Sequence, residues 1–172
     1  MLELYKQFSF CEINTLVINY AHDTRYSRTK LSTHDRREIP CTQALHLHEV
    51  ANIVQRIHTP SIPEAFANCE VILINEGQFF PDLYQWTKYM VNSLHKTIYI
   101  AALDGDYQQV GFSNIMQLIP QADIITKLHN KCKECNHSWA IFTHRTTQHT
   151  SQILPGTEHY IPLCRNCYNK RV

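Results

Sequence analysis

The chain has 172 residues, of which 44% are hydrophobic and 18% are charged, and its formal net charge is +1. These values are typical of a globular protein of one domain, or one domain with a small appendage, whose core needs no disulfides. A net charge near zero does not by itself imply a polyanion-binding surface, and we expect no nucleic-acid partner. The sequence has neither an apolar run of membrane-spanning length nor the apolar core of a signal peptide. We therefore expect a cytoplasmic protein without membrane contact.

Strands and helices alternate over residues 1–128. Short β-branched and apolar runs predict strands, and apolar residues three or four apart predict helices. The expected strands are residues 15–20, 69–74, 97–103 and 123–128. A helix is expected over 43–57 and another opens at Pro81 and Asp82, while residues 21–42 are expected to form a loop. This alternation predicts an α/β fold, with a mostly parallel sheet and helices on both faces.

Residues 129–172 form a smaller lobe marked by two Cys-x-x-Cys pairs. Each pair can point two thiolates at one ion, and two pairs complete the tetrahedron that Zn²⁺ prefers. Two disulfides are the competing interpretation, which a reducing cytosol disfavours. A thioredoxin-like redox motif would explain one pair but not both. We therefore expect one structural zinc ion, bound by Cys132, Cys135, Cys164 and Cys167.

The other cysteines and the histidines show weaker patterns. Cys11, Cys41 and Cys69 have no paired spacing, so we expect them to be small, packed residues with no chemistry. The eleven histidines are scattered along the chain, and we expect most of them to lie on the surface. Neither group predicts a further site.

A carboxylate follows the second buried strand, in the pair Asn75–Glu76. Open α/β sheets bind ligands at the carboxyl ends of their strands, and nucleotide-binding folds often place a carboxylate there to manage Mg²⁺ or a nucleophile. Taken alone, such a glutamate is more often the first solvated residue of a loop. Gly77, Phe79 and Phe80 follow it, a combination suited to a flat apolar ligand beside a polar reaction centre.

Residues 103–112 follow the third expected strand and so fall on the same edge of the sheet. Asp104–Gly105 predicts a tight turn, and Tyr107 and Phe112 are candidates for the wall of a pocket. The alternative is a surface turn with two aromatic side chains packed on the core. The sequence of this segment alone favours that alternative.

Seven segments spread over nearly the whole chain carry a common pattern. They are VINYAHDTRYS (17–27), THDRR (33–37), NEGQFFPD (75–82), AALDGDYQQVGF (101–112), KLHNKCKEC (127–135), FTHR (142–145) and HYIPLCRNCY (159–168). Their order and approximate spacing resemble those of thymidine kinases of the zinc-containing cellular and poxvirus type. The resemblance implies a P-loop-kinase-like α/β domain over residues 1–128 and a zinc-binding lasso lobe over 129–172.

The resemblance also implies an activity, the transfer of the ATP γ-phosphoryl group, with Mg²⁺, to the 5′-hydroxyl of thymidine. Glu76 matches the family's general base, which takes the proton from that hydroxyl. Asp23, Arg25 and Asn75 match positions that support the phosphates and Mg²⁺. The matches to substrate-binding positions are Phe79, Leu103, Tyr107, Phe112, Thr143 and Tyr160. Family members assemble as homo-oligomers, often homotetramers, so we expect a homo-oligomer.

Three features depart from the family pattern. The family's first strand and its phosphate loop, glycine-x-x-x-x-glycine-lysine-serine/threonine, do not occur in these 172 residues, which begin inside the match to the following helix. Asn75 stands where the family usually has aspartate, a change that should weaken Mg²⁺ binding. Pro155 replaces the first of two lasso glycines while Gly156 keeps the second, so this loop should close differently.

Several interpretations stay open. We expect a truncated form of a longer gene product, because residues 75–112 keep nearly all the pocket residue types of a working enzyme. The alternatives are a non-catalytic relative, which binds nucleoside or partners a full-length kinase, and a chain that does not fold. Two further alternatives are a zinc-ribbon nucleic-acid-binding protein, which would bind DNA in a salt-sensitive way, and a structural subunit that co-purifies with a complete kinase.

Overall fold

The computed structural model of the protein describes residues 1–21, 30–32, 38–51, 66, 68–152, 154 and 157–171. In it the chain forms two compact units, Met1–Leu103 and Asp104–Val172, called unit 1 and unit 2 below. The expected division into domains after residue 128 remains a prediction. None of the described helices is long and apolar enough to cross a bilayer.

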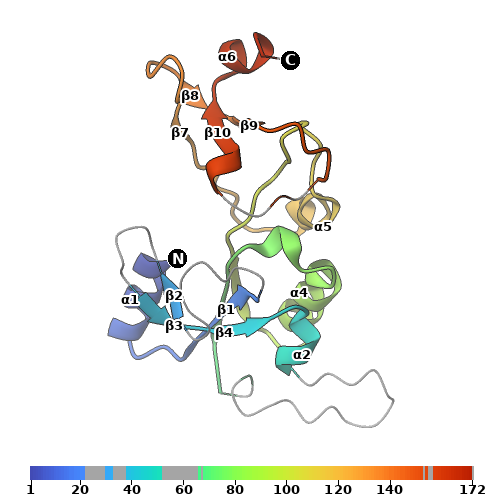
Figure 1. The fold of residues 1–172 in the computed structure, drawn as a ribbon. Coiled ribbons are helices and arrows are strands. Elements are labelled where there is room, and N and C mark those ends of the chain that lie inside the picture. The colour runs from blue at the N-terminus through green and yellow to red at the C-terminus, as the bar shows by residue number, and fades with distance from the viewer. Residues whose placement is uncertain are drawn as a thin grey trace. The chain divides into compact units, whose positions relative to one another are not determined.

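Unit 1 is built on a parallel sheet with the strand order β4-β1-β5-β6 (Figure 1). The strands are β1 (Thr15–Tyr20), β4 (Thr42–Ala44), β5 (Val71–Ile74) and β6 (Thr97–Ile100). The sequence predicted β1 with these bounds, and β5 and β6 lie within the stretches expected for them. Every residue of β5 is buried, as is typical of a parallel strand covered on both faces.

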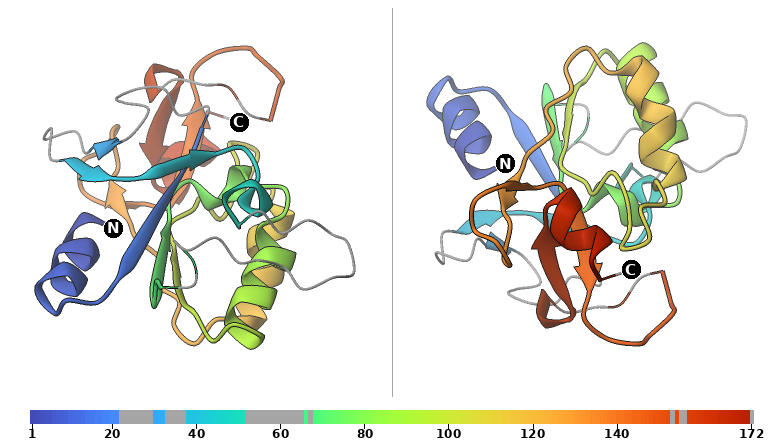
Figure 2. Two further views of the ribbon diagram at one scale, coloured as in Figure 1. Left: turned by 90° about the horizontal axis from the view of Figure 1, so that it is seen from below. Right: turned by 90° about the horizontal axis from the view of Figure 1, so that it is seen from above.

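Helices cover both faces of this sheet, as the alternating sequence predicted. The helices are α1 (Leu2–Phe10), α2 (Leu47–Ala51) and α4 (Leu83–Asn92). Figure 2 shows α1 and α4 on opposite sides of the strands. On one face Leu2 of α1 packs with Val17 of β1. On the other, α4 buries Leu83, Trp86 and Met90, the stripe that its helical spacing predicts.

Two expectations for unit 1 are wrong. The stretch expected to be a loop contains β2 (Lys30–Ser32) and β3 (Glu38–Pro40), which form an antiparallel pair, and also the start of β4. These strands are three residues long, too short to show an alternating pattern. The helix expected over 43–57 begins only at Leu47, because residues 43 and 44 belong to β4, and residues 52–57 lie outside the described part of the chain.

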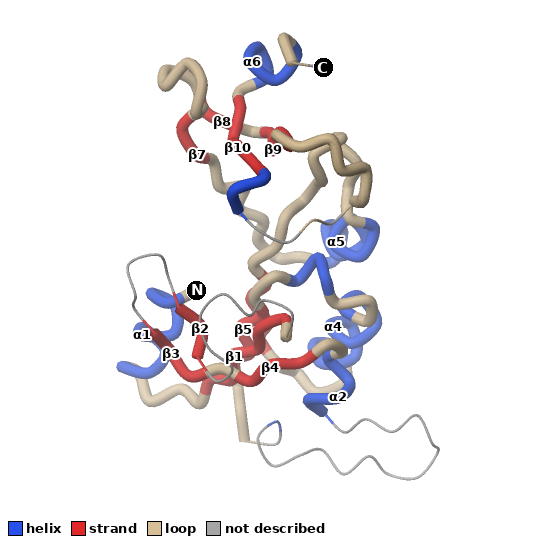
Figure 3. The backbone as a smooth tube through the Cα atoms, in the orientation of Figure 1, coloured by secondary structure: helices blue, strands red, loops and turns tan. Residues whose placement is uncertain are grey.

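Unit 2 consists mainly of loops that connect short elements (Figure 3). Its helices are α5 (Ser113–Leu118) and α6 (Arg165–Asn169). Its strands pair antiparallel, β7 (Asn130–Lys131) with β8 (Trp139–Ala140) and β9 (Phe142–Arg145) with β10 (Tyr160–Leu163). The strand expected over 123–128 is wrong. Ile124 and Leu128 are 85% and 86% exposed in a loop, because an apolar run forms a strand only beside a hydrogen-bonding partner.

Candidate active site and metal centre

Several candidate site residues of unit 1 lie at or just beyond the carboxyl ends of three neighbouring strands. Asn19 lies near the end of β1, Asn75 and Glu76 follow β5, and Leu103 follows the loop after β6. Because β1, β5 and β6 are parallel neighbours, these positions share one edge of the sheet, where open α/β sheets bind ligands. The sequence correctly grouped Asn75, Glu76 and Leu103 at this edge.

Glu76 has an unusual backbone conformation for a glutamate. Its φ and ψ are 56° and 41°, in the left-handed region, where a residue with a side chain costs on the order of 1 kcal/mol. The amide of Gly77 donates to the carbonyl of Ala101 at 3.0 Å, which ties the turn to the end of β6. A Cβ on Gly77 would lie 2.6 Å from Cγ2 of Ile100, so only glycine fits this close approach.

Gln78 fixes the side chain of Glu76 and was not predicted as a site residue. It is 5% exposed, and its Nε2 donates to Oε2 of Glu76 at 2.7 Å. Its Oε1 accepts from the amide of Leu103 at 3.1 Å. One buried amide therefore holds both the carboxylate and the loop after β6. The sequence offered no signal for this role, because it depends on burial and on hydrogen-bond partners that only the fold supplies.

Asn75 is joined to the end of the neighbouring strand. Its Nδ2 donates to Oδ1 of Asn19 at 2.9 Å, and Asn19 is 3% exposed. Asn19 was not predicted as a site residue, because nothing in the expected strand 15–20 indicates that its amide is buried beside Asn75. Asn75 places a neutral amide where the family pattern implied by the resemblance has a carboxylate. Its side-chain oxygen is a group that can accept a hydrogen bond from metal-bound water.

An aromatic group stands beside this polar edge. Phe79, in the short helix η1 (Gly77–Phe79), is half-buried, and its ring lies 5.3 Å from that of Tyr20. The ring of Tyr20 also meets Phe80 edge-on at 5.3 Å. Leu103 is 47% exposed. The turn that carries Glu76 therefore also carries an aromatic side chain, and the part of Phe79 and Leu103 in binding a substrate remains a prediction.

Two of the predicted residues of unit 2, Tyr107 and Tyr160, lie beside one buried guanidinium. Arg145 is 5% exposed, and its side chain lies 3.7 Å from the ring centroid of Tyr107 and 5.1 Å from that of Tyr160. It donates to the hydroxyl of Tyr160 at 2.7 Å and to the carbonyls of His149, Ser151 and Gln152. Arg145 therefore closes the loop between β9 and β10. Sequence reasoning did not single it out, because nothing near it in the sequence marks a buried charge.

Phe112 and Thr143 complete the predicted set in unit 2. Phe112 is 8% exposed and immediately precedes α5, while Thr143 is half-buried on β9, opposite Pro162 of β10. Asp106 shapes the loop that runs from Tyr107 to Phe112, because its Oδ1 accepts from the amides of residues 108 and 110 at 2.8 and 2.9 Å. Other predicted positions, Asp23, Arg25, Pro155 and Gly156, lie outside the described residues.

The four cysteines of the two Cys-x-x-Cys pairs come together in unit 2. Their Sγ atoms all lie within 4.8 Å of one another, and those of Cys135 and Cys164 are 3.9 Å apart. Sulfur atoms in a tetrahedron with metal–sulfur bonds of about 2.3 Å lie about 3.8 Å apart, so the geometry fits a single ion. Cys132, Cys164 and Cys167 are buried. Four cysteines close together can hold one metal ion, and they leave it no open position.

The local backbone favours thiolate at the first pair. Burial would raise the pKa of Cys132, but hydrogen bonds from the backbone amides of Cys135, Cys164 and Glu134 lower that pKa to about 6. Burial and the neighbouring thiols instead raise the pKa of Cys167 to about 12. Because thiolate is the form that binds metal, the first pair presents the ligand form more readily than Cys167 does.

Comparison with known proteins agrees with this arrangement. A sequence model of the family described as thymidine kinase matches residues 1–168. The cytosolic thymidine kinase of Bos taurus is 35% identical over 171 residues, which is 99% of this chain and 66% of the relative. The human enzyme is also 35% identical over 171 residues, covering 67% of its length. The thymidine kinase of Yaba monkey tumor virus is 34% identical over 171 residues, with 86% of its length covered.

The chain thus spans about two thirds of the length of the bovine relative. The match extends through β1, the Glu76 turn, the loop around Tyr107 and both cysteine pairs. The mostly parallel sheet, its helices and the cysteine cluster are in keeping with the resemblance that the sequence motifs carried. The chain belongs to the thymidine kinase family.

Proposed function

We propose that this protein is a thymidine kinase, which transfers the γ-phosphoryl group of ATP to the 5′-hydroxyl of thymidine in deoxynucleotide salvage. The observation that carries the proposal is the position of Glu76, in a strained turn at the carboxyl end of β5, with its carboxylate held by buried Gln78. A strained turn fixed by a buried partner is a feature found at functional sites. It occurs here in a chain whose relatives are named thymidine kinases.

In the proposed reaction Glu76 accepts the proton of the 5′-hydroxyl as the oxygen attacks the phosphoryl group. Its fixed carboxylate lowers the cost of orienting the base. Asn75, with Asp23 and Arg25, would support the phosphates and Mg²⁺, which would neutralise the charge on them when bound. The remaining proposed contacts, to the nucleoside, come from Phe79, Leu103, Tyr107, Phe112, Thr143 and Tyr160.

The first test replaces Glu76 by glutamine, which keeps the shape of the side chain and removes its basicity. We expect the turnover number to fall by about 10²–10⁴-fold, the usual contribution of a general base, with thymidine affinity little changed. Turnover is measured as thymidine monophosphate formation, and affinity by calorimetry with thymidine, both on the natural protein. Because the phosphate-loop motif is not among these 172 residues, the two quantities are measured separately.

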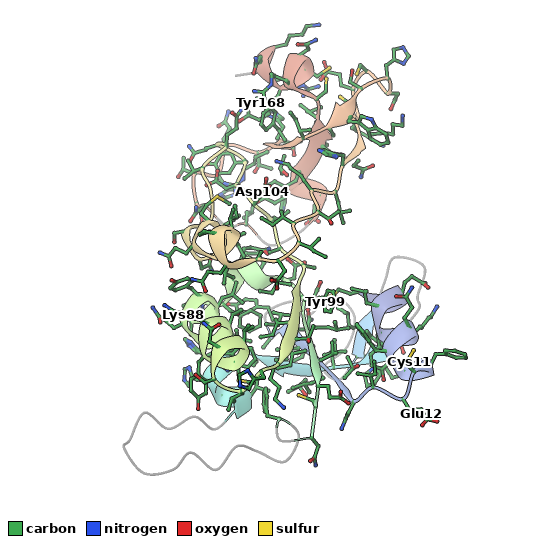
Figure 4. All side chains as sticks on the ribbon, turned by 180° about the vertical axis from the view of Figure 1, so that it is seen from behind. Cys11, Glu12, Lys88, Tyr99, Asp104 and Tyr168 are labelled. Atoms are coloured by element: carbon green, nitrogen blue, oxygen red, sulfur yellow. The ribbon has the colours of Figure 1, made fainter. Side chains whose placement is uncertain are left out.

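Glu12→Gln is the matched control. Glu12 also has a positive φ of 58°, but it is exposed and lies away from the sheet edge, where Figure 4 shows it projecting from the ribbon. Its replacement should leave both quantities unchanged. Unchanged turnover in Glu76→Gln would remove Glu76 from the role of base. A natural protein that does not bind thymidine would overturn the proposed function.

A second candidate function is a non-catalytic relative, which binds nucleoside or partners a full-length kinase. The amide pair of Asn75 and Asn19 favours it, since neither side chain supplies the charge that attracts Mg²⁺. Thymidine binding without turnover in the natural protein would support this alternative. The strained turn at Glu76, whose carboxylate Gln78 holds, supports the kinase.

We also propose that the metal of unit 2 is Zn²⁺, since four thiolates in a tetrahedron suit this ion. It would be structural, because Cys132, Cys135, Cys164 and Cys167 fill its coordination sphere. By family relation we propose a cytoplasmic homo-oligomer, as a homotetramer, without nucleic-acid or membrane partners. Light scattering of the purified protein measures the oligomeric state.

A further inference from the structure

A second cluster of metal-ligating side chains lies in unit 1, away from the four cysteines. The donor atoms of His46, His48 and Asp82 all lie within 4.8 Å of one another. Nδ1 of His48 is 2.9 Å from Oδ2 of Asp82, and the ring centroids of the two histidines are 5.1 Å apart. His46 and Asp82 are half-buried and His48 is exposed, so the cluster is open to solvent on one side.

Two carboxylates hold the segment that carries both histidines. Asp82 accepts from the amides of Leu47 at 3.1 Å and His48 at 2.9 Å. Glu49 accepts from the amides of Leu45 and His46, both at 3.3 Å. The four successive backbone amides of residues 45–48 are therefore hydrogen-bonded, which fixes the backbone of both histidines. Such outer contacts are what orient ligands at metal sites.

The hydrogen bonds also keep Asp82 in its charged form. Burial would raise the pKa of Asp82, but the hydrogen bonds from the backbone amides of His48 and Leu47 and from the His48 ring outweigh burial and lower that pKa. The carboxylate lies beside the two imidazoles, and all three side chains are groups that bind divalent metals.

The spacing of the donor atoms fits a coordinated ion. Tetrahedral ligands with bonds of about 2.1 Å lie about 3.4 Å apart. The 2.9 Å between the His48 and Asp82 donors and the 4.8 Å limit for all three donors lie on either side of that separation. A hydrogen bond between these two residues would explain their approach but not the neighbouring His46. Two imidazoles and one carboxylate suit Zn²⁺ and similar divalent transition metals, while Mg²⁺ and Ca²⁺ prefer oxygen alone.

We propose that His46, His48 and Asp82 bind a second divalent transition-metal ion, Zn²⁺, in unit 1. Three protein ligands leave positions for water, so this ion exchanges more readily than one held by four cysteines. It would fasten the start of α2 to Asp82, the residue before α4. Asp82 is the last residue of the segment 76–82, which begins with the Glu76 turn. The ion would therefore also restrain the end of this segment.

The test counts zinc in the natural protein, with the four-cysteine site filled, at buffered low-micromolar free Zn²⁺. We expect two zinc ions per chain in the wild type and one in both His46→Gln and His48→Gln. His95→Asn should keep two, because His95 is an exposed histidine of the same unit and asparagine tolerates its φ of 51°. Elemental analysis after rapid desalting into the same zinc buffer gives the counts.

A second measurement needs no variant of the cluster. Zinc added to the protein that already holds its first ion should shift the imidazole nitrogen resonances of His46 and His48 together, at one equivalent. One zinc ion per wild-type chain, or shifts confined to other histidines, would overturn the proposal. So would two zinc ions retained in both His46→Gln and His48→Gln.

Discussion

The two units hold their candidate site residues by different means. In unit 1 the Glu76 turn rests on fully buried aliphatic side chains, among them Ile72, Leu73 and Ile74. In unit 2 many of the buried apolar residues are themselves cysteines, and one guanidinium closes the loop beside Tyr107. Burial of apolar area stabilises unit 1, whereas unit 2 depends on side-chain-to-backbone hydrogen bonds and, in our proposal, on metal ligation by its four cysteines. The two units should therefore fail under different perturbations.

The largest expected effect is that of Cys164→Ser. Removing one of four ligands should release the metal and unfold unit 2, because structural zinc contributes on the order of 10 kcal/mol to the folding of small domains. Hydrogen exchange resolved by peptide should show loss of protection over β9 and β10, while β1 and β5 stay protected. Elemental analysis should find the four-cysteine site empty. Cys11→Ser is the control, since Cys11 is exposed and far in sequence from the cluster.

Loss of hydrogen-exchange protection across both units would show that unit 1 also depends on the metal. It would contradict the conclusion that the two units are stabilised by different means. Trp86, which is 4% exposed in α4, provides a second probe of unit 1 in a Trp139→Phe background. Its fluorescence should be unchanged by Cys164→Ser. A metal content unaffected by Cys164→Ser would contradict the four-cysteine site itself.

Arg145→Lys is expected to have the next largest effect. Lysine keeps the charge but cannot reach the hydroxyl of Tyr160 and three carbonyls at once, so buried acceptors lose their donors. We expect the free energy of unfolding of unit 2 to fall by about 3 kcal/mol and the metal to remain bound. Denaturant titration followed by hydrogen exchange measures this loss.

Arg165→Lys is the matched control for that substitution. Arg165 is exposed at the start of α6, and its side chain lies 4.8 Å from the ring centroid of Phe142. Its replacement should change stability by no more than about 0.5 kcal/mol, as is usual for surface substitutions. Equal losses from the two variants would mean that Arg145 does not hold the loop.

Gly77→Ala probes the tight packing of unit 1 and has the smallest expected effect. Its added methyl group would meet Ile100, so we expect the free energy of unfolding to fall by about 1–2 kcal/mol. Turnover should fall as well, because the Glu76 turn must shift. Gly105→Ala is the control, since a Cβ added there would lie 3.5 Å from the carbonyl oxygen of Val110, an ordinary van der Waals distance. Thermal unfolding of the two variants should therefore differ, and equal melting temperatures would show that the close approach is relaxed at little cost.

Much of unit 1 could be predicted because its elements are long enough to show a period. β1 and the apolar stripe of α4 follow directly from the side-chain pattern. The β2–β3 pair could not be predicted, because strands of three residues are too short to show an alternating pattern. The run over 123–128 shows the converse, because its composition favours a strand but pairing decides the outcome.

The candidate site divides in the same way. Spacing alone grouped the four cysteines, since each pair is local in sequence. Gln78 and Arg145 could not be found from the sequence, because their roles come from burial and from acceptors that only the fold supplies. His46 and His48 were expected to be surface residues, and nothing in the sequence indicates that Asp82 lies beside them.

The left-handed backbone conformation of Glu76 lowers the stability of its turn, while its side chain supplies the proposed base. Glycine adopts this conformation without strain, so a selection for stability alone would replace Glu76 by glycine and lose the carboxylate. Under the role proposed for Glu76, a glutamate at this position gives a less stable turn in exchange for a base at the reaction centre. Homologues that have lost activity should therefore drift first at this residue, toward glycine or asparagine, before their cores change.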